Sequence, residues 1–181
     1  MAWPAGNIYY ADGVASADVT DGSEGNDQLT GTEPGASTLT GTIGGGQSGT
    51  FWTFTALAND PNLTTWESGN YIAQINMNAL GVDVTWGIEI NRVDSAGTIV
   101  ENLATGAATD HSTATVETLT WANASAKAVN AGDRIQIAVI GVRAASHGNQ
   151  ACDIDVGTGS EATTTKLNIP IPSTRRIYII S

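Results

Sequence analysis

The amino-acid sequence predicts an all-β protein, an antiparallel two-sheet sandwich of jelly-roll type with an extended N-terminal arm. Charged residues make up only 14% of the 181 residues, while Gly occurs 21 times, a balance typical of short strands joined by many turns. From residue 50 onward, apolar and polar residues alternate with a period of two, and no convincing helical period appears. Strands of this kind bury their apolar faces between two packed sheets.

Residues 1–48 have a different texture, rich in Gly and Thr, with scattered single apolar residues. This pattern predicts an extended arm over 1–48, followed by the sandwich domain over 49–181. The aromatic residues Trp3, Tyr9 and Tyr10 would be costly to leave in water. We therefore expect the arm to pack on its own domain or on a neighbouring chain.

The clearest strand is expected at 82–92, where apolar residues such as Trp86 and Ile88 alternate strictly with polar ones. The turn residues 94–97 then predict a hairpin with a strand at 98–100. In all, the pattern predicts about eight to ten strands. The others are expected at 50–55, 71–77, 114–122, 134–143, 152–156, 163–169 and 177–180.

The charge balance excludes some partners. A net charge of -11 would repel a phosphate backbone, so we expect no nucleic-acid binding. The arginines Arg134, Arg143, Arg175 and Arg176 could instead seat a carboxylate of a neighbouring subunit. No stretch approaches the length of a membrane span, and the first residues lack the pattern of an export signal. We expect a protein that is made soluble and has no membrane partner.

The sequence offers little for catalysis. His111 and His147 lie in loop-like segments outside any motif, and Cys152 shares the apolar face of its strand with Ile154 and Val156. No GxSxG motif occurs. We therefore predict no enzyme, no metal site built from His and Cys, and no cofactor. An esterase-like site that involves one of the histidines is the minor alternative.

Residues 22–31, Gly-Ser-Glu-Gly-Asn-Asp-Gln-Leu-Thr-Gly, resemble one turn of the calcium-binding nonapeptide repeat of RTX proteins. Those repeats share ligands between stacked turns, and one turn alone does not supply the roughly six to eight oxygens that calcium needs. Calcium binding at the acidic residues from Asp21 to Asp27 stays an open alternative. Asp153 and Asp155, on the polar face of their strand, are interpreted as solvated carboxylates.

Five tryptophans suggest a second function, because flat aromatic rings stack on sugars. Trp52 and Trp86 lie with apolar faces, which leaves Trp66 and Trp121 as the candidates for exposure. The alternative hypothesis is therefore a carbohydrate-binding β-sandwich module that mediates surface adhesion through these two residues.

Three segments, WESGNYIAQINMNAL, VTWGIEINRVDSAG and NAGDRIQIAVIGV, follow a small-residue arm. In this order they resemble the jelly-roll decoration or cement proteins of tailed bacteriophages. The resemblance implies a non-enzymatic, trimeric virion protein on the capsid surface, assembled in the host cytoplasm, that stabilises the phage head by bridging capsomers. Its partners would be the major capsid protein and copies of itself. The candidate contacts are Trp3, Tyr9, Tyr10, Arg175, Arg176 and Tyr178.

Overall fold

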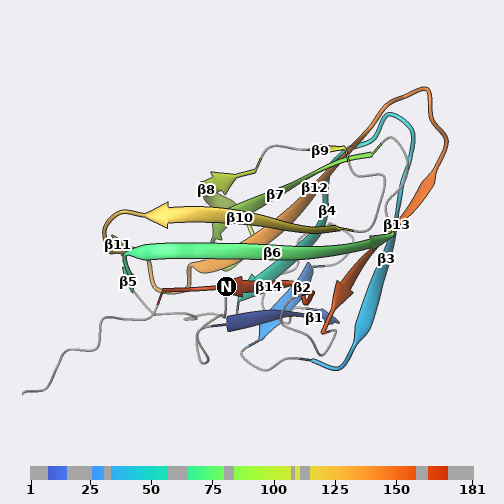
Figure 1. Cartoon of the computed structure of the whole chain (residues 1–181). Helices are drawn as coiled ribbons and strands as arrows, with labels where there is room; N and C mark the ends of the chain where they lie inside the picture. The colour runs from blue at the N-terminus through green and yellow to red at the C-terminus, as the bar shows by residue number, and fades with distance from the viewer. Residues whose placement is uncertain are drawn as a thin grey trace, which may run out of the picture.

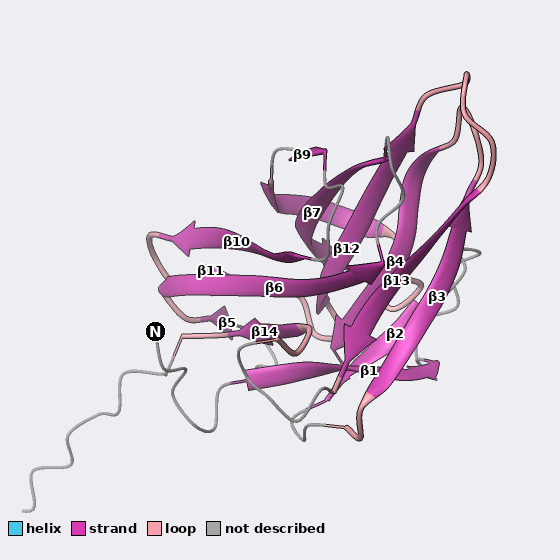
Figure 2. Cartoon of the chain, turned by 45° about the vertical axis from the view of Figure 1, so that its right-hand side comes forward, coloured by secondary structure: helices cyan, strands magenta, loops and turns pink. Residues whose placement is uncertain are grey.

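The computed structural model describes residues 8–15, 26–30, 34–56, 65–79, 84–106, 109–110, 115–157 and 163–170. These residues form strands and turns and no helix (Figures 1 and 2), which confirms the all-β class. In this part of the chain no helix therefore has the length and apolar character needed to cross a membrane.

The strands vary in length from two to eleven residues. They are β1 (Ile8–Ala15), β2 (Asn26–Thr30), β3 (Ser37–Ile43), β4 (Ser48–Ala56), β5 (Thr65–Trp66), β6 (Gly69–Ala79), β7 (Val84–Val93), β8 (Ile99–Thr105), β9 (Thr109–Asp110), β10 (Thr115–Asn123), β11 (Lys127–Ala128), β12 (Arg134–Arg143), β13 (Gln150–Val156) and β14 (Lys166–Asn168).

Twelve strands form one large sheet, ordered β3-β13-β6-β14-β1-β2-β4-β12-β7-β8, with β10 paired to β6 and β9 paired to β7. β5 and β11 form a separate two-stranded sheet. The large sheet is mixed, because β2 runs parallel to β4. It curls so that β10 lies against β7 and β8 without pairing to them. The observed hydrogen bonding thus differs from the expected antiparallel two-sheet arrangement, and the jelly roll stays a prediction.

The described parts of the expected N-terminal arm are strands of this same sheet. β1 pairs with both β14 and β2, and β3 pairs with β13 along its whole length. The single apolar residues Ile8, Ala11 and Leu29 are buried in the core. Scattered apolar residues are enough here, because neighbouring strands supply the rest of the apolar surface. Residues 1–48 are therefore not a separate extended arm wherever the structure describes them.

Most of the predicted strands are confirmed. β12 covers 134–143, as predicted, and β7 pairs with β8 as the expected hairpin. Its turn is closed by Asp94, whose backbone N–H donates to the Thr98 carbonyl at 3.0 Å, and Gly97 N–H donates to the Asp94 carbonyl at 3.1 Å. The segment 177–180 lies outside the described residues.

The turn between β3 and β4 and the connection that follows β12 meet at one tip of the molecule, at the upper right of Figure 1. There Gly46 N–H donates to the Arg143 carbonyl at 3.1 Å, and Arg143 N–H donates to the Gln47 carbonyl at 2.9 Å. The β3–β4 turn is therefore tied to the end of β12, and β3 and β13 run back from this tip as a pair.

Candidate partner-binding site

β8 carries the two most exposed large apolar side chains in the described part of the chain. Ile99 and Val100, at its start, are 51% and 44% exposed. β8 is the last strand of the sheet and pairs only with β7 among the described strands. A free strand edge with exposed apolar residues, and without Lys or Pro, is a template for contact with another chain.

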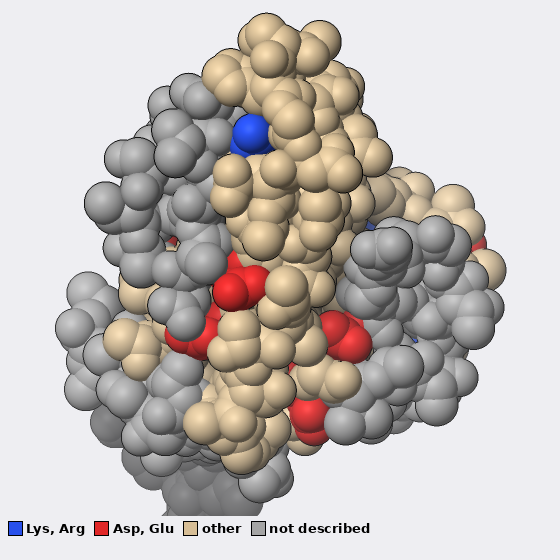
Figure 3. All heavy atoms as spheres, turned by 90° about the vertical axis from the view of Figure 1, so that its right-hand side faces the viewer, with Lys and Arg blue, Asp and Glu red and all other residues tan. Residues whose placement is uncertain are grey.

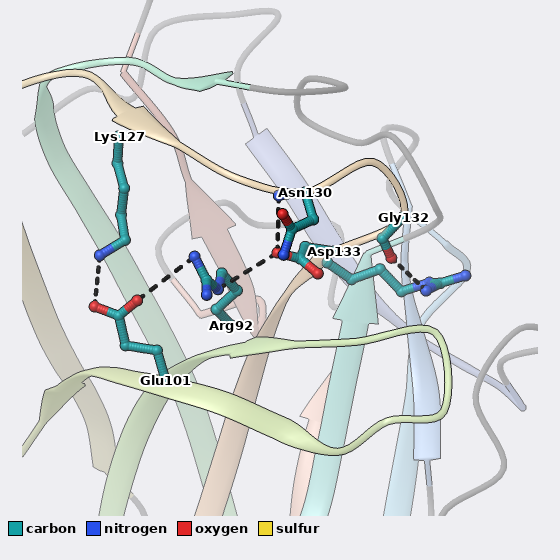
Figure 4. Close-up of polar contacts among 7 residues, drawn as sticks. Arg92, Glu101, Lys127, Asn130, Gly132 and Asp133 are labelled. Carbon is teal, nitrogen blue, oxygen red and sulfur yellow. Dashed lines mark hydrogen bonds and ion pairs between the residues drawn. The ribbon is translucent and has the colours of Figure 1, made fainter.

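A network of ion pairs and hydrogen bonds connects β8 to its neighbours (Figure 4). Lys127 Nζ donates to Glu101 Oε1, and Arg92 Nη1 lies 3.7 Å from Glu101 Oε2. Arg92 Nε lies 3.5 Å from Asp133 Oδ2, which also accepts the Asn130 N–H at 3.0 Å. These contacts link β8 to β7, β11 and the start of β12. They also compensate the single charge of β8, Glu101.

The structure places only part of the predicted partner site. Tyr9 and Tyr10 lie in β1, half-buried, inside the sheet between β14 and β2. They are positioned as strand residues, so only part of each side chain is accessible. The remaining candidates, Trp3, Arg175, Arg176 and Tyr178, lie outside the described residues.

The two tryptophans of the glycan hypothesis lie together but differ in accessibility. Trp66 is fully buried, with 0% exposure, whereas Trp121 is half-buried. Their ring centroids are 6.1 Å apart in a T-shaped arrangement, and Trp121 packs against Tyr71 at 4.7 Å. Trp66 is a candidate for exposure in the glycan hypothesis, but it is buried and packs edge to face against Trp121 of another strand. Its ring face is closed to a sugar.

The reactive side chains are scattered. Cys152 is buried, as predicted, and burial raises the pKa of its thiol to about 11. His147 is half-buried in the turn after β12, and His111 lies outside the described residues. Asp155 accepts hydrogen bonds from Thr38 at 2.7 Å and from Asn76 at 3.3 Å. Within the described ranges, no three His, Cys, Asp or Glu residues are grouped to hold a metal ion.

The sequence did not identify Ile99 and Val100 as candidate partner contacts. The segment 98–100 was recognised as the second strand of a hairpin, but its position at the end of the sheet follows from pairing across the whole chain. The available signal was a pair of consecutive apolar residues, Ile99 and Val100, directly after a turn. Such a pair puts one apolar side chain on each face of a strand.

No protein-family model matches the sequence, and no curated protein is significantly similar to it. Two structures of a CocE/NonD family hydrolase from Staphylococcus aureus are similar in fold, with TM-scores of 0.56 and 0.55 at 12% and 10% identity. The matches cover 91% and 92% of this chain but only 36% of the hydrolase chain. A structure of infectious bursal disease virus follows with a TM-score of 0.38 and 10% identity, over 80% of this chain and 31% of the viral one. This chain thus spans about a third of the length of the hydrolase, and the likeness concerns the fold alone.

Proposed function

We propose that this chain is a non-enzymatic virion structural protein, a jelly-roll decoration or cement protein on the capsid surface of a tailed bacteriophage. It would be assembled in the host cytoplasm as a trimer and would stabilise the head by bridging capsomers. Its partners would be the major capsid protein and further copies of itself. The observation that carries the proposal is the edge of β8, which pairs only with β7 among the described strands and exposes Ile99 and Val100. Strand edges of this kind bind other chains by strand addition and apolar contact.

The charges also support a protein-binding role. A net charge of -11 would keep the protein away from packaged or free DNA. The same charge would oppose contact between two copies, but Glu101 on β8 is compensated by Lys127 and Arg92. The edge can therefore approach another chain without adding an unpaired carboxylate to the contact.

The described residues give weaker support to the other two functions. An acyl-transfer enzyme needs an accessible nucleophile beside a base, whereas Cys152 is buried and His147 lies in a turn. A glycan platform needs exposed ring faces, whereas Trp66 is buried and Trp121 is packed against Tyr71. The proposal therefore rests on association between proteins.

The test is the mass of the protein in solution, measured by light scattering over a concentration series. The unmodified protein is expected to be a trimer or larger assembly, and the double variant Ile99→Lys/Val100→Lys is expected to be smaller with an unchanged melting temperature. The matched control, Ala124→Lys/Ser125→Lys, adds the same charge to an exposed turn after β10 and should leave the mass unchanged. A monomeric unmodified protein, or an assembly indifferent to the β8 substitutions, would contradict the proposal.

A further inference from the structure

A pocket of about 350 Å³ lies between β3 and β4, with Asp27 of β2 in its wall. Phe51 and Trp52 supply aromatic surface, and the exposed Thr38 and Thr40 stand at its rim. This volume lies in the range of small-ligand pockets, which combine apolar and aromatic walls with a few polar groups. The pocket is separate from the β8 edge.

A bulge in β4 builds the aromatic wall. Val139 of β12 is opposite Trp52, and the next residue, Ile140, is opposite Thr50, so Phe51 has no partner across the ladder. An extra residue of this kind re-aims side chains, and here Phe51 and Trp52 lie 6.2 Å apart, ring centroid to ring centroid. Both rings also pack on Trp86.

Gly41 of β3 lacks a side chain and so leaves space for the Trp52 ring in the aromatic wall. A Cβ atom at this position would lie 2.8 Å from Cζ2 of Trp52, closer than carbon atoms approach one another. The indole of Trp52 therefore lies directly against the backbone of β3. Strand β3, the bulge of β4 and the indole of Trp52 are thus packed together at this wall.

The charged group of the pocket wall is the carboxylate of Asp27, and no cation among the described residues pairs with it. Asp27 is only 6% exposed and has no hydrogen-bond or ion-pair partner in the described part of the chain. Burial, together with the nearby Asp12 of β1, raises the pKa of Asp27 to about 6. The described residues of β2, β3 and β4 contribute no other charged group. A buried carboxylate without a partner is costly, and a cation beside it would relieve that cost.

We propose that this pocket binds the ammonium or guanidinium group of a lysine or arginine side chain, with Asp27 as the counter-ion and the half-buried Phe51, beside the 5% exposed Trp52, as the aromatic wall. Carboxylates form strong charge-assisted hydrogen bonds with such groups, and aromatic faces attract them through the cation–π interaction. A divalent metal fits less well, because these residues offer one carboxylate and no group of metal ligands. The net charge of -11 would draw a cationic ligand toward the protein, and Figure 3 shows more acidic than basic surface among the described residues of one face.

The proposal makes binding dependent on pH. The cation pairs with ionised Asp27, so affinity is highest well above pH 6 and falls as the carboxylate takes up a proton. With one proton involved, affinity falls about tenfold for each pH unit below that point. Asp12 is the charged group from the adjoining strand, and Asp12→Asn is expected to move the fall in affinity to lower pH.

The experiment titrates the protein with N-acetyl-arginine amide and N-acetyl-lysine amide at low salt and pH 7.5. The readout is the indole N–H signal of Trp52 by NMR, identified with Trp52→Phe. The neutral N-acetyl-citrulline amide, close in size to the arginine compound, is the ligand control. Saturable shifts are expected with both cations, about tenfold weaker binding at pH 5, and at least about tenfold weaker binding in Asp27→Asn.

Glu67→Gln is the matched variant, because it removes one negative charge between β5 and β6, outside the pocket wall. It should keep the affinity, and Asp27→Asn should keep the melting curve of a folded protein. Phe51→Leu should weaken the binding of both cationic ligands by a few-fold. Equal responses to the arginine and citrulline compounds, or unchanged affinity in Asp27→Asn, would overturn the proposal. Absence of saturation by either cation up to high millimolar concentration would overturn it as well.

Discussion

Gly141 of β12 lies directly beneath the ring of Trp86. A Cβ atom on Gly141 would lie 2.7 Å from Cζ3 of Trp86 and 2.9 Å from Cδ2 of Phe51. The two rings meet edge to face over this glycine, with centroids 5.6 Å apart. The missing side chain in β12 therefore makes the space that the aromatic cluster fills.

Replacing Gly141 by alanine is expected to destabilise the protein. The added methyl group would push against two large rings in a packed core, a change that costs about 1–3 kcal/mol. Urea unfolding followed by tryptophan fluorescence measures the effect.

The control for this substitution is Gly148→Ala. Gly148 is exposed, and a Cβ atom there would have no neighbour within 4 Å. Its free energy of unfolding should stay within about 0.5 kcal/mol of the unmodified protein. Equal effects of the two substitutions would mean that the contact beneath Trp86 is not tight.

The ion pairs around Arg92 should differ in strength according to burial. Asp133 is buried, whereas the Glu101 side chain is partly exposed. Asp133→Ala leaves Arg92 without its buried partner and removes the bond to the Asn130 N–H, so a loss of about 3–5 kcal/mol is expected. Glu101→Gln should cost about 1 kcal/mol or less. The comparison uses chemical denaturation of both variants, and a larger loss for Glu101→Gln would contradict it.

Local pattern predicted the strands that carry their own apolar residues. β12 joins Ile135, Ile137 and Val139 in one run, and it was found at its observed bounds. β3 was not found, because Gly41 stands where the pattern needs an apolar residue. The ring that fills this position, Trp52, comes from another strand. A local pattern cannot show apolar surface that a distant segment supplies.

The tryptophans of the glycan hypothesis also depend on segments that are distant in sequence. Trp66 belongs to a two-residue strand and has no period around it, so its exposure could not be read from its neighbours in sequence. Trp121 packs on it edge to face, and Trp121 is itself placed opposite Tyr71 by the pairing of β10 with β6. The position of Trp86 on an apolar face was predictable, since β7 alternates apolar and polar residues from Val84 to Asn91.

Asp27 should make stability depend on pH. Its pKa rises from an ordinary 3.8 to about 6 in the folded protein. Between these values the folded state holds a proton that the unfolded state has released, so the free energy of unfolding falls as pH rises through this window. Asp27→Asn removes this loss. Its stability relative to the unmodified protein should therefore increase from pH 4 to pH 7, by up to about 3 kcal/mol.

Urea unfolding of both proteins at the two pH values measures this difference. Glu67→Gln serves again as the control for the loss of one negative charge. A constant difference between Asp27→Asn and the unmodified protein would show that the carboxyl group titrates alike in the folded and unfolded states.

Deleting residues 1–20 is expected to unfold the protein rather than to detach an arm. The deletion removes β1, whose Tyr10 is opposite Lys166 on one side and Thr30 on the other. It also removes the buried Ile8 and Ala11. β14 and β2 would each be left with an open edge, and the sheet would lose the link between them.

Circular dichroism melts of this deletion and of a shorter one, residues 1–6, test that expectation. The shorter deletion keeps all of β1 and should melt like the unmodified protein, whereas deletion of 1–20 should lose the cooperative transition. If the longer deletion melts normally, β1 is not an integral strand, and the arm predicted from the sequence would regain its support. If it unfolds, loss of assembly in that variant says nothing about partner contacts, and the substitutions at Ile99 and Val100 are the informative ones.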